Sequence, residues 1–296
     1  MKPPAFEYYR PTTVEEAIAL LNRYGPEAKV LAGGQSLLPM MKFRLARPSV
    51  LVDLCWVRDL AYVRQVDGTV AFGAMARLAS LESDRVRALC PILAEAGHHI
   101  GHPAIRHQGT VCGSLAHADP AAELPVLALA LDAEFVAMGP IGARVIPAQD
   151  FFVTMLTTSL GPSEILTEAR FPILQQGGGW GFAELSRRPG DFALAIAAAT
   201  LQVGANGMIA TARIALGAMA DRAIRCPEAE AALVGERCGK TVFEAVAALA
   251  SGPLDPPSDV HAASSYRRHL AKVLIERALT QTWQRLHAIP LSPAPL

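Results

Sequence analysis

The sequence predicts an α+β protein with two domains, and three observations support this. Short apolar runs that suit buried strands alternate with amphipathic segments that suit helices along the whole chain. A glutamine- and glycine-rich stretch, residues 175–179, has the composition of a linker. Beyond it, Asn206-Gly207 separates two long apolar runs, which is the strongest short signal of a β-hairpin. We therefore expect a first domain at residues 1–176, a second at 177–288 and a proline-rich tail at 289–296.

The first domain is expected to form two lobes, about residues 1–57 and 58–176. Thr12 and Glu15 have the spacing of a capping box at the start of a helix. In the second lobe, Asp67-Gly68 is a hairpin signal and Ser80 is placed to cap a helix. The other predicted elements are strands at residues 29–31, 49–54, 62–66, 69–73, 133–138, 143–146 and 165–173.

The second domain is expected to be a three-stranded antiparallel sheet with a helical layer. Three apolar runs follow the linker, and three segments of helical periodicity follow the runs. The strands are expected at residues 180–185, 192–203 and 208–219, and the helices at 228–234, 241–250 and 264–287.

Composition excludes several functional classes. The chain is 51% apolar and 18% charged, and its formal net charge is zero, so no electrostatic case exists for nucleic acid or an anionic membrane. No apolar run approaches the roughly 20 residues that a membrane span needs. The N-terminus lacks the apolar core of a signal peptide, so we expect a cytoplasmic protein.

Neither the cysteines nor the histidines form a convincing metal site. The five cysteines are scattered and none belongs to a C-x-x-C pair, which argues against disulfides, zinc or an iron–sulfur cluster carried by this chain. His98 and His102 have helical spacing, but Gly101 and Pro103 interrupt a helix there. No nucleophile elbow of the G-x-S-x-G kind occurs either. We expect no metal ligands and no catalytic side chain.

Two glycine-rich loops are the candidate binding features. The first, residues 32–36, follows a short buried strand, and the second contains Thr110, Gly113 and Ser114. An apolar helix at 121–131 follows the second loop, with Asp119 as its expected N-cap and Pro120 at its first position. Such loops expose backbone N–H groups to anions, so together they suit the pyrophosphate of a dinucleotide. Neither has the Walker or G-x-G-x-x-G pattern, and plain chain reversal is the alternative.

Three ordered motifs carry a family resemblance. They are AGGQSLLPMMKFRLARPSVLVDL at 32–54, GTVCGSLAHADPAAELP at 109–125 and SRRPGDFALAIAAA at 186–199. The chain resembles the FAD-binding medium subunit of the molybdenum hydroxylases, which include carbon monoxide dehydrogenase, xanthine dehydrogenase and quinoline oxidoreductase. The resemblance implies a two-lobed FAD-binding domain of the vanillyl-alcohol-oxidase (PCMH) type, followed by the C-terminal α+β domain.

The resemblance also implies a set of FAD-binding residues. These are Leu31, Ala32, Gly33, Gly34, Gln35, Ser36 and Leu37 in the first loop; Thr110, Gly113 and Ser114 in the second; Ile100 near the nucleotide; Glu123, or its neighbour Asp119; Leu166 at the adenine; and Arg188 and Phe192 at a turn facing the flavin. Phe192 has an alternative as an ordinary core residue, and the Arg187–Asp191 corner has one as a surface ion pair. The chain departs from the family at Cys112, where the second loop usually has glycine, at Gln35, where the carbon monoxide dehydrogenase type has histidine, and at Ala183, where some relatives have lysine.

The implied function is electron transfer within a larger complex. A small partner subunit would carry two [2Fe–2S] clusters, and a large one would carry molybdopterin cytosine dinucleotide and oxidise the substrate. Electrons would reach FAD on this chain and then an external acceptor, in a dimer of heterotrimers. Gln35 favours an N-heteroaromatic substrate over carbon monoxide. The alternatives are a self-sufficient flavin oxidase or reductase, a carbon monoxide dehydrogenase medium subunit, and a nucleotide-binding scaffold without redox work.

Overall fold

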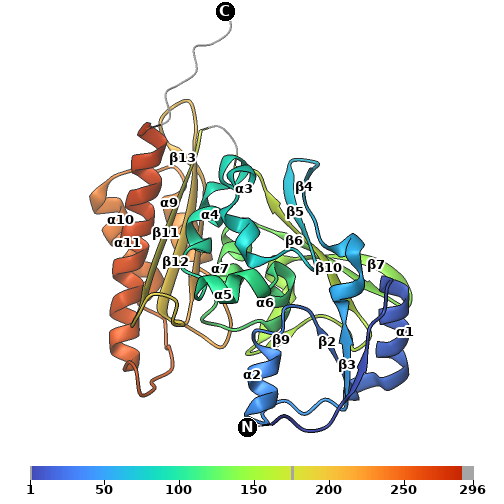
Figure 1. The fold of residues 1–296 in the computed structure, drawn as a ribbon. Coiled ribbons are helices and arrows are strands. Elements are labelled where there is room, and N and C mark those ends of the chain that lie inside the picture. Colours follow the sequence, from blue (N-terminus) through green and yellow to red (C-terminus); the bar gives the residue numbers. More distant parts are fainter. Residues whose placement is uncertain (1, 175–176, 289–296) are drawn as a thin grey trace, which may run out of the picture. The chain divides into compact units, whose positions relative to one another are not determined.

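The protein is described by a computed structural model that covers residues 2–174 and 177–288, so the expected tail and part of the linker lie outside the described residues. The chain forms two compact units (Figure 1). The first contains residues 1–119 and 132–173, and the second contains residues 120–131 and 174–296. The expected linker lies at the boundary between residues 173 and 174, where the chain passes from the first unit to the second. The earlier segment 120–131 also belongs to the second unit.

The first unit holds a small parallel sheet and a larger antiparallel one. Its elements are β1 (Glu7–Tyr9), α1 (Val14–Tyr24), β2 (Ala28–Leu31), α2 (Leu37–Lys42), β3 (Val50–Asp53), β4 (Val63–Val66), β5 (Thr69–Gly73), α3 (Asp84–Leu89), α4 (Pro91–Gly97), α5 (Pro103–Gln108), α6 (Val111–His117), β6 (Glu134–Gly139), β7 (Gly142–Pro147), α8 (Ala148–Phe151), β8 (Phe152–Thr154), β9 (Thr157–Thr158) and β10 (Ile165–Pro172).

The small sheet has the order β1-β3-β2, with β1 and β2 both parallel to β3. Its central strand, β3, is buried along its whole length, as its continuous apolar run predicts. The capping box of α1 lies one residue later than expected. Thr13 accepts from the Glu16 N–H, and the Glu16 carboxylate accepts from the Thr12 N–H at 2.7 Å. The sequence Thr-Thr-Val-Glu-Glu allows both registers, so local spacing alone does not choose between them.

The larger sheet has the order β4-β5-β10-β6-β7. Both expected hairpins are confirmed, and Asp67 and Gly68 take the positive φ angles, 46° and 74°, that a tight two-residue turn requires. The helix cap expected at Ser80 is wrong. Residues Leu78–Glu82 form a 3-10 helix, and it is Ser83 that caps α3 by accepting from the Val86 N–H.

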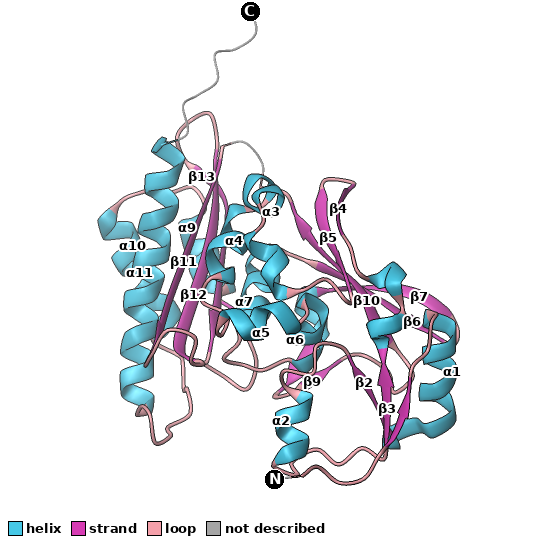
Figure 2. Ribbon diagram, in the orientation of Figure 1, coloured by secondary structure: helices cyan, strands magenta, loops and turns pink. Residues whose placement is uncertain are grey.

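The second unit is a sheet covered on both faces by helices (Figure 2). Its elements are α7 (Glu123–Ala130), β11 (Gly178–Ser186), β12 (Ala193–Val203), β13 (Ile209–Gly217), β14 (Ile224–Arg225), α9 (Pro227–Leu233), α10 (Lys240–Ser251) and α11 (Ser264–Ala288). The three expected strands pair in antiparallel fashion, and the two-residue strand β14 extends the sheet.

Helix α11 lies so close to β11 that glycine is required on the strand. A Cβ atom at Gly181 would lie 1.9 Å from the Ala278 carbonyl oxygen, and one at Gly179 would lie 2.5 Å from that of Thr282. A side chain at either position would push the helix away from the sheet. This close packing explains why the strand begins with a glycine-rich sequence that also resembles a linker.

Helix α7 covers the opposite face of the same sheet. A Cβ atom at Gly217 would lie 2.6 Å from the Val126 side chain, and the Thr200 hydroxyl donates to the Ala130 carbonyl at 3.3 Å. All eight residues of α7 are buried, which accounts for its continuous apolar sequence. The expected cap is wrong: the helix begins at Glu123 after Ala122, and Asp119 does not cap it.

Candidate functional site

The structure brings the two glycine-rich loops into backbone contact within the first unit. A Cβ atom at Gly33 would lie 2.3 Å from the Gln108 carbonyl oxygen and 2.6 Å from the Gly109 Cα atom. A Cβ atom at Gly113 would lie 3.7 Å from the Ala32 Cβ atom. Two segments about 75 residues apart in the sequence therefore form one small-residue surface, and the absence of a side chain at Gly33 permits the approach.

The first loop presents backbone N–H groups that the protein does not use. Within the described part of the chain, the N–H groups of residues 33–36 donate no hydrogen bond to protein. Gly34 has a φ of 71°, which turns the chain so that Leu38 donates to the Gly34 carbonyl at 3.1 Å. The Gln35 side chain turns back on the loop and donates to the Gly33 carbonyl at 3.2 Å. The loop is half-buried, so its free N–H groups fit a bound phosphate.

The second loop is the start of a helix, which the sequence analysis did not predict. Thr110 caps α6, and its hydroxyl accepts from the Gly113 N–H at 3.1 Å. Thr110 is buried, and the next residue, Val111, donates to the Ala76 carbonyl at 3.0 Å. A Cβ atom at Gly113 would lie 2.6 Å from the Thr110 hydroxyl oxygen. A side chain at position 113 would therefore displace the Thr110 hydroxyl from its capping position, and it would also fill the space near Ala32.

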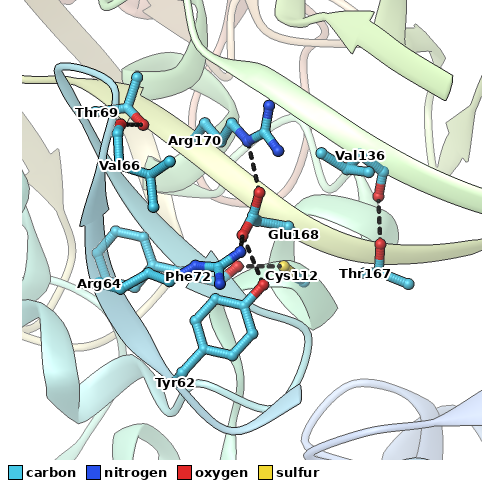
Figure 3. Close-up of polar contacts among 10 residues, drawn as sticks. All are labelled: Tyr62, Arg64, Val66, Thr69, Phe72, Cys112, Val136, Thr167, Glu168 and Arg170. Atoms are coloured by element: carbon cyan, nitrogen blue, oxygen red, sulfur yellow. Dashed lines mark hydrogen bonds and ion pairs between the residues drawn. The ribbon is translucent and has the colours of Figure 1, made fainter. Parts of the chain in front are cut away.

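Cys112 points away from the loop surface. Its side chain is 2% exposed, and its thiol donates to the Phe72 carbonyl of β5 at 3.5 Å (Figure 3). Burial raises the pKa of the Cys112 thiol well above its usual range, and the charge of Glu168 raises it further. The thiol is therefore neutral and packed beneath α6, so it does not obstruct the surface shared by the two loops.

A buried carboxylate lies at the centre of the sheet that supports α6. The Glu168 side chain accepts from Tyr62 at 2.6 Å, from Arg64 at 2.8 Å and from Arg170 at 2.5 Å (Figure 3). Burial raises the pKa of Glu168, but the hydrogen bonds from Tyr62, Arg170 and Arg64 outweigh burial and hold it below its usual value. No local sequence signal indicates this network, because Tyr62 and Arg64 lie about a hundred residues before Glu168 and Arg170.

The remaining expected FAD contacts divide between the two units. In the first, Ile100 and Leu166 are buried and Asp119 is half-buried; in the second, Glu123 is buried, whereas Arg188 is exposed. Phe192 is 67% exposed, so its alternative as an ordinary core residue is wrong. Arg187 and Asp191 form the expected surface ion pair at 3.7 Å.

A second carboxylate, Glu184, lies on the sheet face that α7 covers. Glu184 pairs with Ile196 on β12, and Ile196 pairs with Gly217 on β13. Residues paired in this way share one face of the sheet, and Gly217 lies against Val126 of α7. Burial raises the pKa of Glu184 to about 8, and the nearby charge of Glu123 adds to this effect. Glu184 therefore holds a proton at neutral pH, a property that nothing in the local sequence indicates.

No metal-binding group is present among the described residues: no cluster of three or more His, Cys, Asp or Glu side chains has a suitable arrangement there. The helix that would align His98 with His102 is absent, as expected, because α4 ends at Gly97 and α5 begins at Pro103. Within residues 2–174 and 177–288, no helix has both the length and the apolar character to cross a membrane.

Comparisons with known proteins cover almost the whole chain. Residues 4–174 match the family described as the FAD binding domain in molybdopterin dehydrogenase, and residues 180–282 match the CO dehydrogenase flavoprotein C-terminal domain. The chain is 42% identical to the 6-hydroxypseudooxynicotine dehydrogenase complex subunit alpha of Paenarthrobacter nicotinovorans, over 96% of this chain and 97% of that one. It is 39% identical to the carbon monoxide dehydrogenase medium chain of Hydrogenophaga pseudoflava, over 96% and 99%.

Solved structures show the same fold. A structure of carbon monoxide dehydrogenase from Hydrogenophaga pseudoflava superposes with a TM-score of 0.93 at 40% identity, covering 96% of this chain and 99% of that chain. The quinoline 2-oxidoreductase from Pseudomonas putida 86 gives a TM-score of 0.91 at 39% identity, covering 97% and 99%. Both domains of the chain therefore have counterparts of known structure over their full length.

Proposed function

Since the chain belongs to the FAD-binding medium subunits of the molybdenum hydroxylases, we propose that it transfers electrons between an iron–sulfur partner and an external acceptor. FAD, when bound, supplies the redox chemistry, because it exchanges electrons with its neighbours. The chain's own task is to bind the cofactor, orient it and set its surroundings. The observation that carries this proposal is the contact between the two glycine-rich loops, which leaves the N–H groups of residues 33–36 available to a pyrophosphate.

The residues present fit the FAD pyrophosphate. On this proposal, residues 33–36 donate to the phosphate oxygens, while Thr110 and Gly113 hold the first turn of α6 in shape beside them. Ser114 is half-buried in the same turn and adds a hydroxyl donor. Cys112 leaves this surface clear, because its thiol packs beneath α6, against β5. Cysteine instead of the usual glycine at position 112 therefore does not argue against FAD binding.

The other cofactor contacts remain predictions. Ile100 and Leu166 offer buried apolar side chains of the first unit, which suit the nucleotide portion of FAD. Glu123, with Asp119 as the alternative, offers a carboxylate that can accept from a ribose hydroxyl. Arg188 and Phe192 are exposed on one turn of the second unit, and only the family resemblance predicts a flavin contact for them.

The proposal places the iron–sulfur and molybdenum centres on partner subunits. The curated relatives are described as a complex subunit alpha, a medium chain and a medium subunit, each of which implies companion chains. The five scattered cysteines of this chain do not supply a cluster motif. We therefore propose a small partner with two [2Fe–2S] clusters and a large partner with molybdopterin cytosine dinucleotide, assembled as a dimer of heterotrimers.

An N-heteroaromatic compound is the proposed substrate of the complex. Relatives at 40% and 35% identity are a nicotine 6-hydroxylase medium subunit and a caffeine dehydrogenase subunit beta. Carbon monoxide dehydrogenase medium chains at 39% and 37% identity keep carbon monoxide as the alternative. Gln35 favours the N-heteroaromatic class, because the carbon monoxide dehydrogenase type has histidine at that position.

Anaerobic reduction of the assembled complex tests the proposal. The chain is purified with its companions from its host and mixed in the absence of oxygen with nicotine, quinoline or carbon monoxide. We expect iron–sulfur absorbance to bleach first and flavin absorbance to follow, whereas the isolated FAD-loaded chain stays oxidised. Reduction of the isolated chain by any of these compounds would contradict the proposal and would favour a self-sufficient flavin oxidase.

A further inference from the structure

We infer that the last residue of α2 and the loop that follows it, residues 42–47, form the surface on which an acidic face of a partner subunit docks. This segment, which we call the basic-apolar loop, contains Phe43 and Leu45 between three cations, Lys42, Arg44 and Arg47. The inference rests on the proposed function, because it requires that this chain works in a complex with companion chains.

The two apolar side chains of the loop are largely exposed. Phe43 is 69% exposed and Leu45 is 76% exposed. Leu38, one turn earlier on α2, is 38% exposed. Clustered exposed aromatic and aliphatic side chains rimmed by charges are typical of interaction sites, whereas scattered single ones are not informative.

Hydrogen bonds hold the backbone of the loop in place, although its side chains are exposed. Met41 is fully buried at its start, and Leu45 donates to the Met40 carbonyl at 2.9 Å. Arg44 takes a φ of 60°, an unfavourable conformation for this residue, and its carbonyl accepts from the Arg47 guanidinium at 3.0 Å. A pre-ordered loop loses little conformational entropy on binding, so its exposed Phe43 and Leu45 are suited to a partner.

Charge indicates the kind of partner. The chain as a whole has no net charge, yet residues 42–47 contain three basic side chains and no acidic one. A second copy of this chain that docked through the same face would oppose like charges across the contact, which is unfavourable. An acidic protein surface with an apolar centre is complementary on both counts. A membrane is a poorer match, because α2 has only six residues and cannot form an extended amphipathic face.

Two paired substitutions in the complex purified from the host test this assignment. Phe43→Ser with Leu45→Ser removes the apolar centre, and Lys42→Glu with Arg47→Glu reverses two charges at the rim. Ile141→Ser is the matched control, because Ile141 is fully exposed at the turn between β6 and β7 of the same unit. The readouts are the ratio of companion chains to this chain after gel filtration, FAD per chain, thermal unfolding, and binding to phosphatidylglycerol vesicles.

The apolar pair of substitutions should weaken association at least about tenfold, as removal of central interface side chains does. The charge reversal should make the complex dissociate at lower salt, and Ile141→Ser should do neither. FAD content and thermal unfolding should stay at wild-type values. In the wild-type protein, amide hydrogen exchange of residues 42–47 should slow in the complex relative to the separated chain, a measurement that does not depend on how the variants fold.

Three results would overturn the assignment while the proposed function stands. They are normal assembly of both variants, loss of FAD with assembly intact, and loss of vesicle binding alone. The second would mean that the cations serve the cofactor, and the third that the loop contacts a membrane. Wild-type protein that leaves its host without companion chains would overturn this inference together with the proposed complex.

Discussion

Replacing Gly33 by alanine tests the contact on which the binding site depends. The new Cβ atom would lie 2.3 Å from the Gln108 carbonyl oxygen, whereas ordinary contacts begin at 3.4 Å. The two loops must therefore separate by about 1 Å, and such overpacking costs about 1–3 kcal/mol of unfolding free energy. Hydrogen bonds to a charged phosphate are each worth about 1.5–3 kcal/mol, so losing one weakens FAD binding roughly 10- to 100-fold.

Two measurements on the apoprotein separate these effects. Urea unfolding reports the loss of stability, and quenching of flavin fluorescence during titration reports the dissociation constant for FAD. Gly239→Ala is the matched control, because a Cβ atom there lies no closer than 4.0 Å to any neighbour, so FAD affinity should not change. Wild-type affinity and stability in the Gly33→Ala protein would refute the reasoning, since they would mean that the two loops do not touch.

Three further predictions follow from other parts of the chain. Gly34→Ala should cost about 1–2 kcal/mol, because Gly34 has a φ of 71°; urea unfolding measures it, and an unchanged midpoint would exclude that conformation. The exposed Cys55 should react with an alkylating reagent in the native protein, while Cys112 should react only after unfolding, since burial keeps its thiol neutral and inaccessible; mass spectrometry identifies the labelled sites, and rapid native labelling of Cys112 would contradict its placement. Glu184 keeps its proton up to pH about 8 when folded but loses it near 4.5 when unfolded, so unfolding free energy should fall between those pH values by up to a few kcal/mol. Glu184→Gln should flatten that fall and match wild type below pH 4.5, and an unchanged pH profile in unfolding curves would show that Glu184 is not the group responsible.

Local sequence chemistry predicted those elements whose signals lie within a few residues. Asp67-Gly68 forms its hairpin because both residues tolerate positive φ, and no distant contact is needed. The cap of α1 lies one residue later than expected, because Thr12 and Thr13 are equally good candidates by local spacing. The second glycine loop is the start of α6 rather than an irregular loop, and Thr110 is the local signal for it, because threonine is a common helix N-cap.

Features that depend on distant contacts were harder to predict. The meeting of the two loops was anticipated because both suit one pyrophosphate, but the requirement for glycine at Gly33 comes from Gln108 as well as from any ligand. Helix α7 was assigned to the first domain, since the visible linker lies about 45 residues later; the structure packs it on the sheet of the second unit. The Glu168 network and the raised pKa of Glu184 arise only from burial, which no short pattern encodes.

The cofactor content of the purified chain tests the central claim most directly. The protein is isolated from its host, its visible spectrum is recorded, and any cofactor released by heat is identified by chromatography. We predict a flavin spectrum and release of FAD at about one molecule per chain. A colourless protein that also fails to take up added FAD would contradict the account and would leave the chain as a nucleotide-binding scaffold without redox work.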